Sequence, residues 1–329
     1  MFHPRPFRPL LRNPHLATIA ANFWRRPDSE QQWPVEEVIY QTEPGVRVLV
    51  HSQRPVVHKG ENPKGELILV HGLEGSSAAG YARSMVHAAL GRGWVTHRFN
   101  MRGCGGRDEL AVTGYHAGQT SDLLAVLRER RRATSLPIFV VGFSLGGNVT
   151  LKLAGELGES AGELLNGVCA VSTPIDLAAC AAALAERRNF LYQGRFLSRL
   201  KDRIRRKNRQ APDVYTLEHL SKVGTIEDFD DYYTARLFGF GTAQNYFRTQ
   251  SSGQFLERIR VPALLVQSKD DPMVPFPVFE HPAFGNNPCL TLLAVEHGGH
   301  LGFLARGKDR FWLDGTILGW AEGNIKKEH

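Results

Sequence analysis

The chain has few cysteines and no closely spaced pair of them. Only four of its 329 residues are cysteines, at positions 104, 169, 180 and 289. Zinc fingers need short cysteine spacings, and small secreted domains need a dense framework of disulfides. The sequence therefore argues against both classes, and we expect four free thiols in a reducing compartment.

Long uninterrupted apolar runs are also missing. No stretch approaches the roughly 20 apolar residues that a membrane-spanning helix requires, and the longest run of small apolar residues is LAACAAALA at 177–185. Arginine and proline repeatedly interrupt residues 1–26, so this segment does not resemble a secretory signal peptide. From these absences we expect a cytoplasmic protein.

Positive charge is in modest excess, and the net charge of the chain is +7. Most of it lies in residues 187–210, with a smaller cluster at 128–132. The favoured interpretation is a solvated helix face. The second is attraction to an anionic lipid or membrane surface, because arginine and lysine flank aromatic residues there. Nucleic-acid binding is least favoured, and we expect no such partner, because no recognised module is present.

Strand and helix patterns alternate along most of the chain. Short apolar runs such as GELILV and PIFVVGF predict buried strands, and helical spacings follow each of them. Such alternation predicts βαβ units and a mostly parallel sheet with helices on both faces. Residues 177–255 lack a clear strand and predict a helical cap. The expected organisation is an N-terminal extension packing on the core (1–34), the α/β core (35–176 and 256–329) and the cap (177–255).

A serine stands at the turn between one predicted strand and the next helix. Residues 142–146 read Gly-Phe-Ser-Leu-Gly, the G-x-S-x-G pattern of a strained strand-to-helix turn that exposes a nucleophilic hydroxyl. The pattern alone is weak, because glycine-serine turns are common. Its position between a strand and a helix makes Ser144 our candidate nucleophile.

Later strand ends supply an acid and a base. VPALLVQS runs into Asp270 and Asp271, and the predicted strand CLTLLAVEH (289–297), which ends with His297, runs into a glycine-bearing loop that ends in His300. A nucleophilic serine needs a histidine base and a carboxylate that orients it. We favour Asp271 and His300, and we keep Asp270 and His297 as alternatives.

Two backbone amides are candidates for an oxyanion hole. Leu145 begins the helix after the nucleophile, where N–H groups are unpaired and the helix dipole is positive. Leu73 follows the strand that ends at His71, in the loop where a second donor is expected. His71 precedes the nucleophile's strand, so we interpret it as a residue that fixes this loop.

With these residues in place, the chain resembles the α/β-hydrolase superfamily, and most closely its YheT-type hydrolases, bacterial relatives of the eukaryotic abhydrolase-domain lipases. The resemblance rests on RNPHLATIAANFWRR, HGLEGSS, FNMRGCGG, GFSLGGNVTLKLAGE, DDPMVP and HGGHLGF. It implies that Ser144, Asp271 and His300 form a triad, with Leu73 and Leu145 as amide donors. It implies hydrolysis of small-molecule or lipid carboxylic esters, including acylglycerols with short or medium chains, and no metal or organic cofactor.

Other chemistries remain open at this stage. Dehalogenases and epoxide hydrolases need a carboxylate where Ser144 stands, so they are disfavoured. Amidase, thioesterase or phospholipase action would use the same triad, and a non-catalytic binding protein of this fold is a further alternative. Aromatic residues of the cap could line an acyl pocket or simply pack within the cap. These candidates are Phe190, Tyr192, Phe196, Tyr232, Tyr233 and Phe238.

Overall fold

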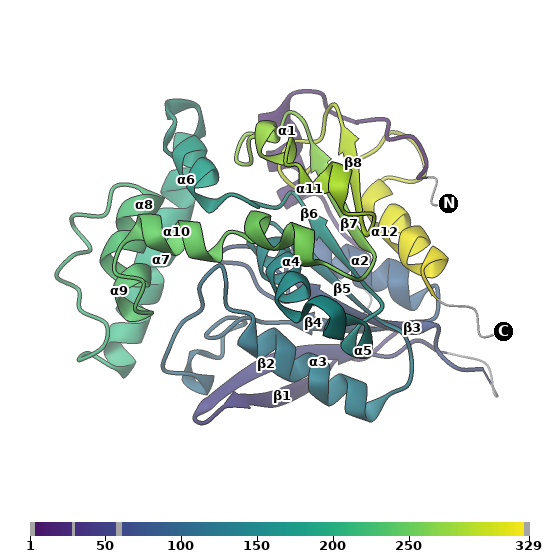
Figure 1. Ribbon diagram of the computed structural model, residues 1–329, viewed down its shortest axis with the longest axis horizontal. Helices are drawn as coiled ribbons and strands as arrows, with labels where there is room; N and C mark the ends of the chain where they lie inside the picture. The colour runs from purple at the N-terminus through teal and green to yellow at the C-terminus, as the bar shows by residue number, and fades with distance from the viewer. Residues whose placement is uncertain (1–3, 28–29, 57–60, 326–329) are drawn as a thin grey trace.

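A computed structural model describes residues 4–27, 30–56 and 61–325, so parts of the predicted N-terminal extension lie outside the described residues. Its centre is an eight-stranded sheet in the order β1-β2-β4-β3-β5-β6-β7-β8 (Figure 1). The predicted α/β architecture with a mostly parallel sheet is confirmed. The strands are β1 (Glu36–Glu43), β2 (Val46–Gln53), β3 (Gly65–Val70), β4 (Trp94–Phe99), β5 (Ile138–Phe143), β6 (Gly167–Val171), β7 (Ala263–Ser268) and β8 (Leu290–Val295).

Only the first edge of the sheet is antiparallel. A hairpin joins β1 to β2 through Pro44 and Gly45, and β2 also pairs antiparallel with β4. From β4 to β8 all neighbours are parallel. Every residue of β3 to β7 is buried, as expected for parallel strands covered on both faces. The carboxyl ends of these strands therefore meet at one edge, where the loops carry the polar residues discussed below.

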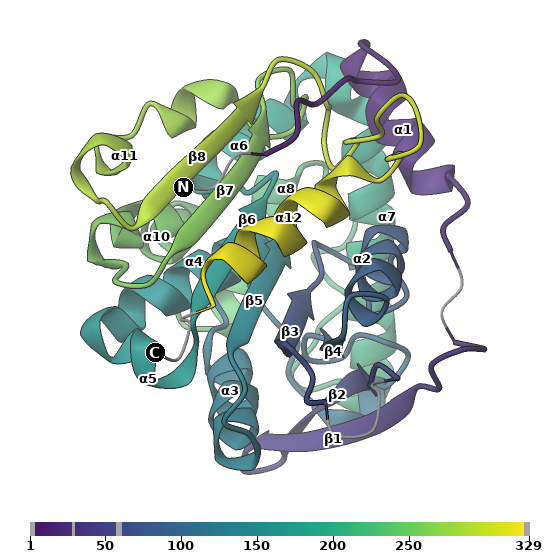
Figure 2. The same cartoon turned by 90° about the vertical axis from the view of Figure 1, so that its right-hand side faces the viewer.

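Helices cover both faces of the sheet (Figure 2). On one face α3 and α4 pack against Ile68 and Val70, whereas α2 and α12 pack against Leu67 and Leu69 on the other. The alternation of these four residues follows the period of two along a strand. The helices of the core are α2 (Gly80–Leu90), α3 (Ser121–Ala133), α4 (Leu145–Leu157), α5 (Ala161–Leu164), α11 (Ala283–Asn286) and α12 (Trp312–Gly323).

A group of helices between β6 and β7 projects from the carboxyl edge of the sheet, at the left of Figure 1. It has its own apolar core, in which Leu200 and Ile204 of the longest helix pack with Phe229 and Tyr233. Met273, from the loop after β7, belongs to the same cluster and ties the cap to the sheet. The helices are α6 (Leu177–Ala185), α7 (Phe190–Gln210), α8 (Ile226–Phe229), a π-helical turn (Asp230–Thr234), α9 (Ala235–Leu237) and α10 (Ala243–Gln250).

The N-terminal segment contains a helix that the sequence did not predict, α1 (Pro14–Phe23). The Asn13 side chain accepts a hydrogen bond from the Leu16 amide and caps the helix, and Pro14 occupies its first turn. Only Ala17 and Ala21 of this helix are buried. The larger apolar residues of the helix, Leu16, Ile19 and Phe23, are exposed instead. Nowhere in the described ranges does a helix combine the length and apolar character needed to cross a bilayer.

Candidate active site

Ser144 lies at the sharp turn between β5 and α4. Its backbone has φ +52° and ψ −122°, a conformation that side-chain-bearing residues rarely adopt. Such strain costs on the order of 1–3 kcal/mol and persists only where the surroundings impose it. The Ser144 amide donates to the Val171 carbonyl of the neighbouring strand at 2.8 Å. The turn thus holds the Ser144 side chain at the carboxyl edge of the sheet.

The glycines around Ser144 are required by close packing. A Cβ on Gly142 would overlap the backbone of Gly146, and a Cβ on Gly146 would overlap the carbonyl oxygens of Val70 and His71. Strand β5, helix α4 and the loop after β3 therefore approach one another more closely than side chains permit. This explains why glycine stands two positions before and two positions after the serine.

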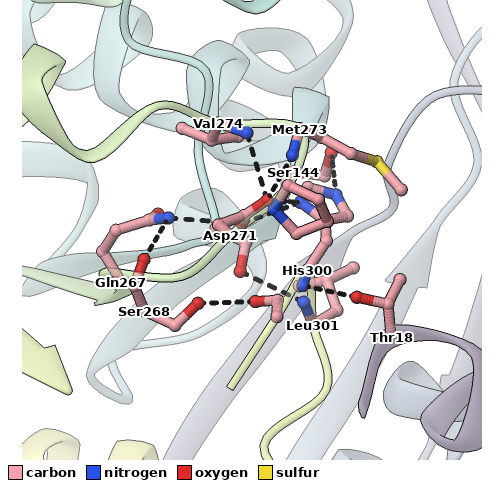
Figure 3. A network of polar contacts seen from close by, with 12 residues as sticks. Thr18, Ser144, Gln267, Ser268, Asp271, Met273, Val274, His300 and Leu301 are labelled. Carbon is pink, nitrogen blue, oxygen red and sulfur yellow. Dashed lines mark hydrogen bonds and ion pairs between the residues drawn. The ribbon is translucent and has the colours of Figure 1, made fainter. Parts of the chain in front are cut away.

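The structure brings Ser144, Asp271 and His300 together at this edge (Figure 3). His300 Nε2 lies 2.9 Å from Ser144 Oγ, and His300 Nδ1 lies 3.0 Å from Asp271 Oδ2. The Asp271 side chain is fully buried and that of His300 is only 9% exposed. A carboxylate that accepts from Nδ1–H leaves Nε2 free to take a proton from the serine, which is the arrangement for nucleophilic catalysis.

Backbone amides fix the Asp271 carboxylate. Asp271 Oδ1 accepts from the amides of Met273 and Val274 at 2.9 and 3.1 Å, and the Gln267 side-chain amide lies 3.2 Å from Oδ2. These donors satisfy the buried carboxylate and hold it against the His300 ring.

The neighbouring aspartate has a different environment. Asp270 Oδ1 accepts from the amides of Gly298 and Gly299, both at 2.9 Å, and Asp270 Oδ2 lies 3.1 Å from His297 Nδ1. Asp270 therefore shapes the loop that carries His300 instead of contacting His300 itself. The two residues held as alternatives, Asp270 and His297, pair with each other on the outer side of this loop.

The backbone amides before and after Leu73 are hydrogen-bonded, which fixes the loop around the Leu73 amide. The Gly72 amide donates to Tyr81 Oη at 3.0 Å, and the Glu74 amide donates to Tyr115 Oη at 2.8 Å. The loop passes close to the serine, because a Cβ on Gly72 would lie 3.1 Å from Ser144 Cβ. Among the described contacts, neither the Leu73 amide nor the amide of Leu145 has a partner.

Buried polar residues brace this loop. His71 Nδ1 lies 2.8 Å from the Gly72 carbonyl, and His71 Nε2 accepts from the Met101 amide. Burial lowers the pKa of His71 to about 4, so the ring is neutral and Nδ1–H donates to the carbonyl. From the cap, Arg203 of α7 forms a buried ion pair with Glu74, the residue after Leu73. Arg203 is thus part of the wall of the site and not of an exposed basic surface.

Two cavities meet at Ser144 and His300. The inner one, about 110 Å³, lies under the cap and has mainly apolar walls. The outer one, about 430 Å³, opens between α1, the Leu73 loop and α7. Apolar residues of the inner wall include Leu184, Leu200, Ile226, Phe229, Phe247 and Val274.

The six cap aromatics divide between the two alternatives that the sequence left open and a third position, exposed to solvent. Phe196 lines both cavities and Tyr192 lines the outer one. Phe190 is 64% exposed to solvent. Tyr232 stacks on His219, Tyr233 stacks on Phe229 within the cap core, and the Phe238 ring packs against His116. Helical spacing in the sequence could not separate residues that face the cap core from those that face the cavity.

Helix α1 holds the His300 loop. Thr18 Oγ1 accepts a hydrogen bond from the His300 amide at 2.9 Å (Figure 3). It also donates to the Pro14 carbonyl at 2.7 Å. A Cβ on Gly299 would overlap Pro14 and Thr18, and one on Gly302 would overlap the Ala17 backbone. This contact was not predicted from the sequence, in which the three glycines of HGGHLG are the only sign of a close backbone approach.

We expect Thr18 to act as a positioning residue for His300. Thr18→Val keeps the shape of the side chain but leaves the His300 amide without its acceptor, so the imidazole should shift relative to Ser144. The expected result is a fall in kcat of about tenfold to hundredfold with little change in KM, because small misplacements cost that much. Steady-state kinetics should show recovery in Thr18→Ser, which restores the acceptor. Equal losses in both variants would contradict this role.

The sequence matches a known family model. Residues 66–306 match the model described as the alpha/beta hydrolase fold. Among curated proteins, the chain is 35% identical to YheT of Escherichia coli, named as a proposed esterase, over 79% of this chain and 78% of YheT. It is 27% identical to a monoacylglycerol lipase of Saccharomyces cerevisiae over 88% of this chain and 66% of that protein. For the human phospholipase ABHD3 the identity is 27%, over 72% of this chain and 58% of ABHD3.

Solved structures share the architecture at low sequence identity. The Pyrococcus furiosus esterase Pf2001 matches with a TM-score of 0.56 and 16% identity, covering 90% of this chain and 98% of the other. A 2,6-dihydroxy-pseudo-oxynicotine hydrolase matches with a TM-score of 0.57 and 19% identity, covering 94% and 71%. At such identities the likeness shows the fold alone.

Proposed function

The chain belongs to the α/β-hydrolase fold family as a YheT-type relative of the eukaryotic abhydrolase-domain proteins, and on that premise we propose that it cleaves carboxylic esters through an acyl-enzyme on Ser144. The observation that carries the proposal is the continuous set of contacts from Ser144 Oγ through His300 to the buried Asp271. Relatives named for esterase, lipase and phospholipase activity support an ester or lipid substrate.

In the first half of the reaction, Ser144 Oγ attacks the ester carbonyl carbon while His300 Nε2 takes the hydroxyl proton. The carbonyl oxygen becomes an oxyanion, which the Leu73 and Leu145 amides stabilise. Each such donor contributes about 3–4 kcal/mol to transition-state stabilisation. The tetrahedral species then collapses: the C–O bond to the alcohol breaks, and His300 returns its proton to the leaving oxygen.

In the second half, a water molecule replaces the departed alcohol. His300 removes a proton from this water as it attacks the acyl carbon, and the same two amides hold the new oxyanion. Collapse breaks the bond to Ser144 Oγ, and His300 protonates the serine. The products are a carboxylic acid and the free enzyme. Asp271 keeps its charge throughout and stabilises the imidazolium form of His300.

Each cavity receives a different part of the ester substrate. The inner cavity is apolar and about 110 Å³, below the roughly 300 Å³ at which drug-sized ligand sites begin, so it holds an acyl chain of short or medium length. The outer cavity has polar residues such as Ser76 and Arg199 in its lining and is open to solvent, so it receives the alcohol portion. This assignment favours esters of short or medium acids with a bulky or polar alcohol.

A series of p-nitrophenyl esters with acyl chains from about two to sixteen carbons tests the proposal. We expect kcat/KM to peak among the short and medium chains and to fall for the longest ones, since an inner cavity of about 110 Å³ is too small to bury them. Hydrolysis rates measured at fixed ionic strength give the profile. Absence of turnover across the whole series would contradict the esterase assignment, and a peak at the longest chains would contradict the placement of the acyl group.

A further inference from the structure

Large exposed apolar side chains concentrate at one end of the molecule. In the described ranges, eleven large hydrophobic residues are exposed, and six of them lie on α1, just after it, or in the first turn of α7. Single exposed apolar residues are ordinary, whereas a cluster marks an interaction surface. We call this cluster the apolar rim; its members are Leu16, Ile19, Phe23, Trp24, Phe190 and Leu191.

Helix α1 is oriented with its large apolar residues outward. Ala17 and Ala21 are buried against the core, whereas Leu16, Ile19 and Phe23 are exposed, Phe23 by 77%. These three side chains recur at a spacing of three and four residues and so form one stripe. A helix that needed only to pack on the core would turn such a stripe inward. This stripe is therefore available to another partner.

The apolar rim lies beside the entrance to Ser144. Ile19 and Phe23 line the outer cavity, together with Arg195 and Phe196 of α7. The helices also contact each other directly, because His15 Nδ1 lies 3.1 Å from Tyr192 Oη. Figure 2 shows α1 beside the upper part of α7 at one end of the molecule. A partner bound to the rim would therefore cover the opening through which substrate enters.

Positive charge accompanies the rim, although Arg188 forms an ion pair with Glu186 and Arg5 forms one with Asp309. Residues 1–27 contain arginine but neither aspartate nor glutamate, and the same is true of residues 187–201, which include Arg187, Arg195 and Arg199. In the later part of the basic segment 187–210, Arg203 and Lys207 are buried, and Arg205 and Arg206 form ion pairs with Asp202 and Asp108. The positive charge that lies next to the exposed apolar residues is therefore that of the N-terminal end of α7.

We propose that the apolar rim docks on the surface of an anionic lipid bilayer. Apolar side chains that enter the acyl boundary, flanked by arginines that meet anionic headgroups, provide the two contributions that bind a protein to such a surface. Docking in this orientation places the outer cavity against the lipid. The inference rests on the proposed function, because the role of docking is to deliver ester substrates from the lipid phase to Ser144.

Flotation of the full chain with vesicles tests the docking. We use phosphatidylcholine vesicles with and without about 30% phosphatidylglycerol, where anionic lipid supplies the surface potential. The wild type should float with the anionic vesicles and lose binding as salt screens the charges. The rim variant Leu16→Gln/Phe190→Gln/Leu191→Gln should bind about tenfold more weakly, because three apolar contacts with the lipid are lost.

A matched variant changes exposed apolar residues away from the rim. Val112→Gln/Val214→Gln/Leu217→Gln should bind within about twofold of the wild type, since lipid attraction scales with the apolar area that enters the bilayer.

A second pair of variants tests the charge. Arg12→Gln/Arg187→Gln should weaken vesicle binding, whereas Arg128→Gln/Arg132→Gln on α3 removes the same charge elsewhere and should not weaken it. The rim variant should retain wild-type hydrolysis of a water-soluble short-chain ester, and its loss should appear only on vesicle-borne ester.

Several results would overturn the docking proposal. The wild type could fail to bind anionic vesicles, or the rim and matched variants could lose vesicle binding equally. Light scattering could instead reveal a dimer that the rim substitutions dissociate, in which case a second copy of the chain would occupy the rim. Ser144→Ala separates this test from the chemistry. If the alanine variant is inactive yet floats like the wild type, docking stands on its own. If the wild type floats but hydrolyses no ester, the proposed function fails and the docking does not.

Discussion

Ser144→Ala is expected to lower ester hydrolysis by about five to six orders of magnitude, to the level left by the oxyanion donors and substrate binding. The reason is the loss of the hydroxyl group that His300 Nε2 is placed to deprotonate, at 2.9 Å. Hydrolysis of a p-nitrophenyl ester by purified protein measures the effect. Thermal unfolding should change little, because alanine preserves the backbone of the turn.

A serine elsewhere in the same cavity provides the control. Ser76 lines the outer cavity, and its Oγ accepts a hydrogen bond from the Ala78 amide. Ser76→Ala removes the same hydroxyl group from a position that His300 does not contact, and activity should stay within a few fold of the wild type. Full activity in Ser144→Ala would contradict the nucleophile assignment.

Asp271→Asn is expected to lower kcat by about four orders of magnitude. The carboxylate accepts from His300 Nδ1–H in the wild type. The asparagine amide can instead donate to Nδ1, which places the ring proton on Nε2, where it faces Ser144 Oγ and prevents proton removal. The activity of Asp271→Asn, measured as a function of pH, should recover in part at high pH, where hydroxide can remove the serine proton in place of His300.

The adjacent residue gives a matched substitution. Asp270→Asn changes the same functional group one position away, where it binds the Gly298 and Gly299 amides. Since the asparagine oxygen can still accept from these amides, the loss should be at most about tenfold. If Asp270→Asn were the more damaging substitution, the roles of the two aspartates would have to be exchanged.

Much of the site could be predicted because each residue follows a recognisable strand. Ser144, Asp271 and the loop of His300 stand directly after apolar runs, and parallel strands bring their carboxyl ends to one edge. The glycines around Ser144 have an equally local cause, a turn too crowded for side chains. Where a residue's place depends on the strand next to it, sequence pattern was sufficient.

Other features depend on contacts between distant segments and left no such pattern. Helix α1 buries only alanines, so nothing in its spacing indicated that Thr18 would reach His300. Arg203 resembled its basic neighbours in the sequence, yet it is buried in an ion pair with Glu74, 129 positions earlier. Tyr233 packs within the cap, away from the cavities. These positions are decided by how the cap and the N-terminal segment pack on the core.

Labelling with a fluorophosphonate probe tests the central claim most directly. The phosphorus atom reacts with a serine hydroxyl only where a neighbouring base removes its proton and amides stabilise the developing charge. We predict one adduct per chain, located at Ser144 by peptide mass spectrometry and absent from Ser144→Ala and His300→Ala. An unlabelled wild-type chain, or an adduct on a different serine, would contradict the account.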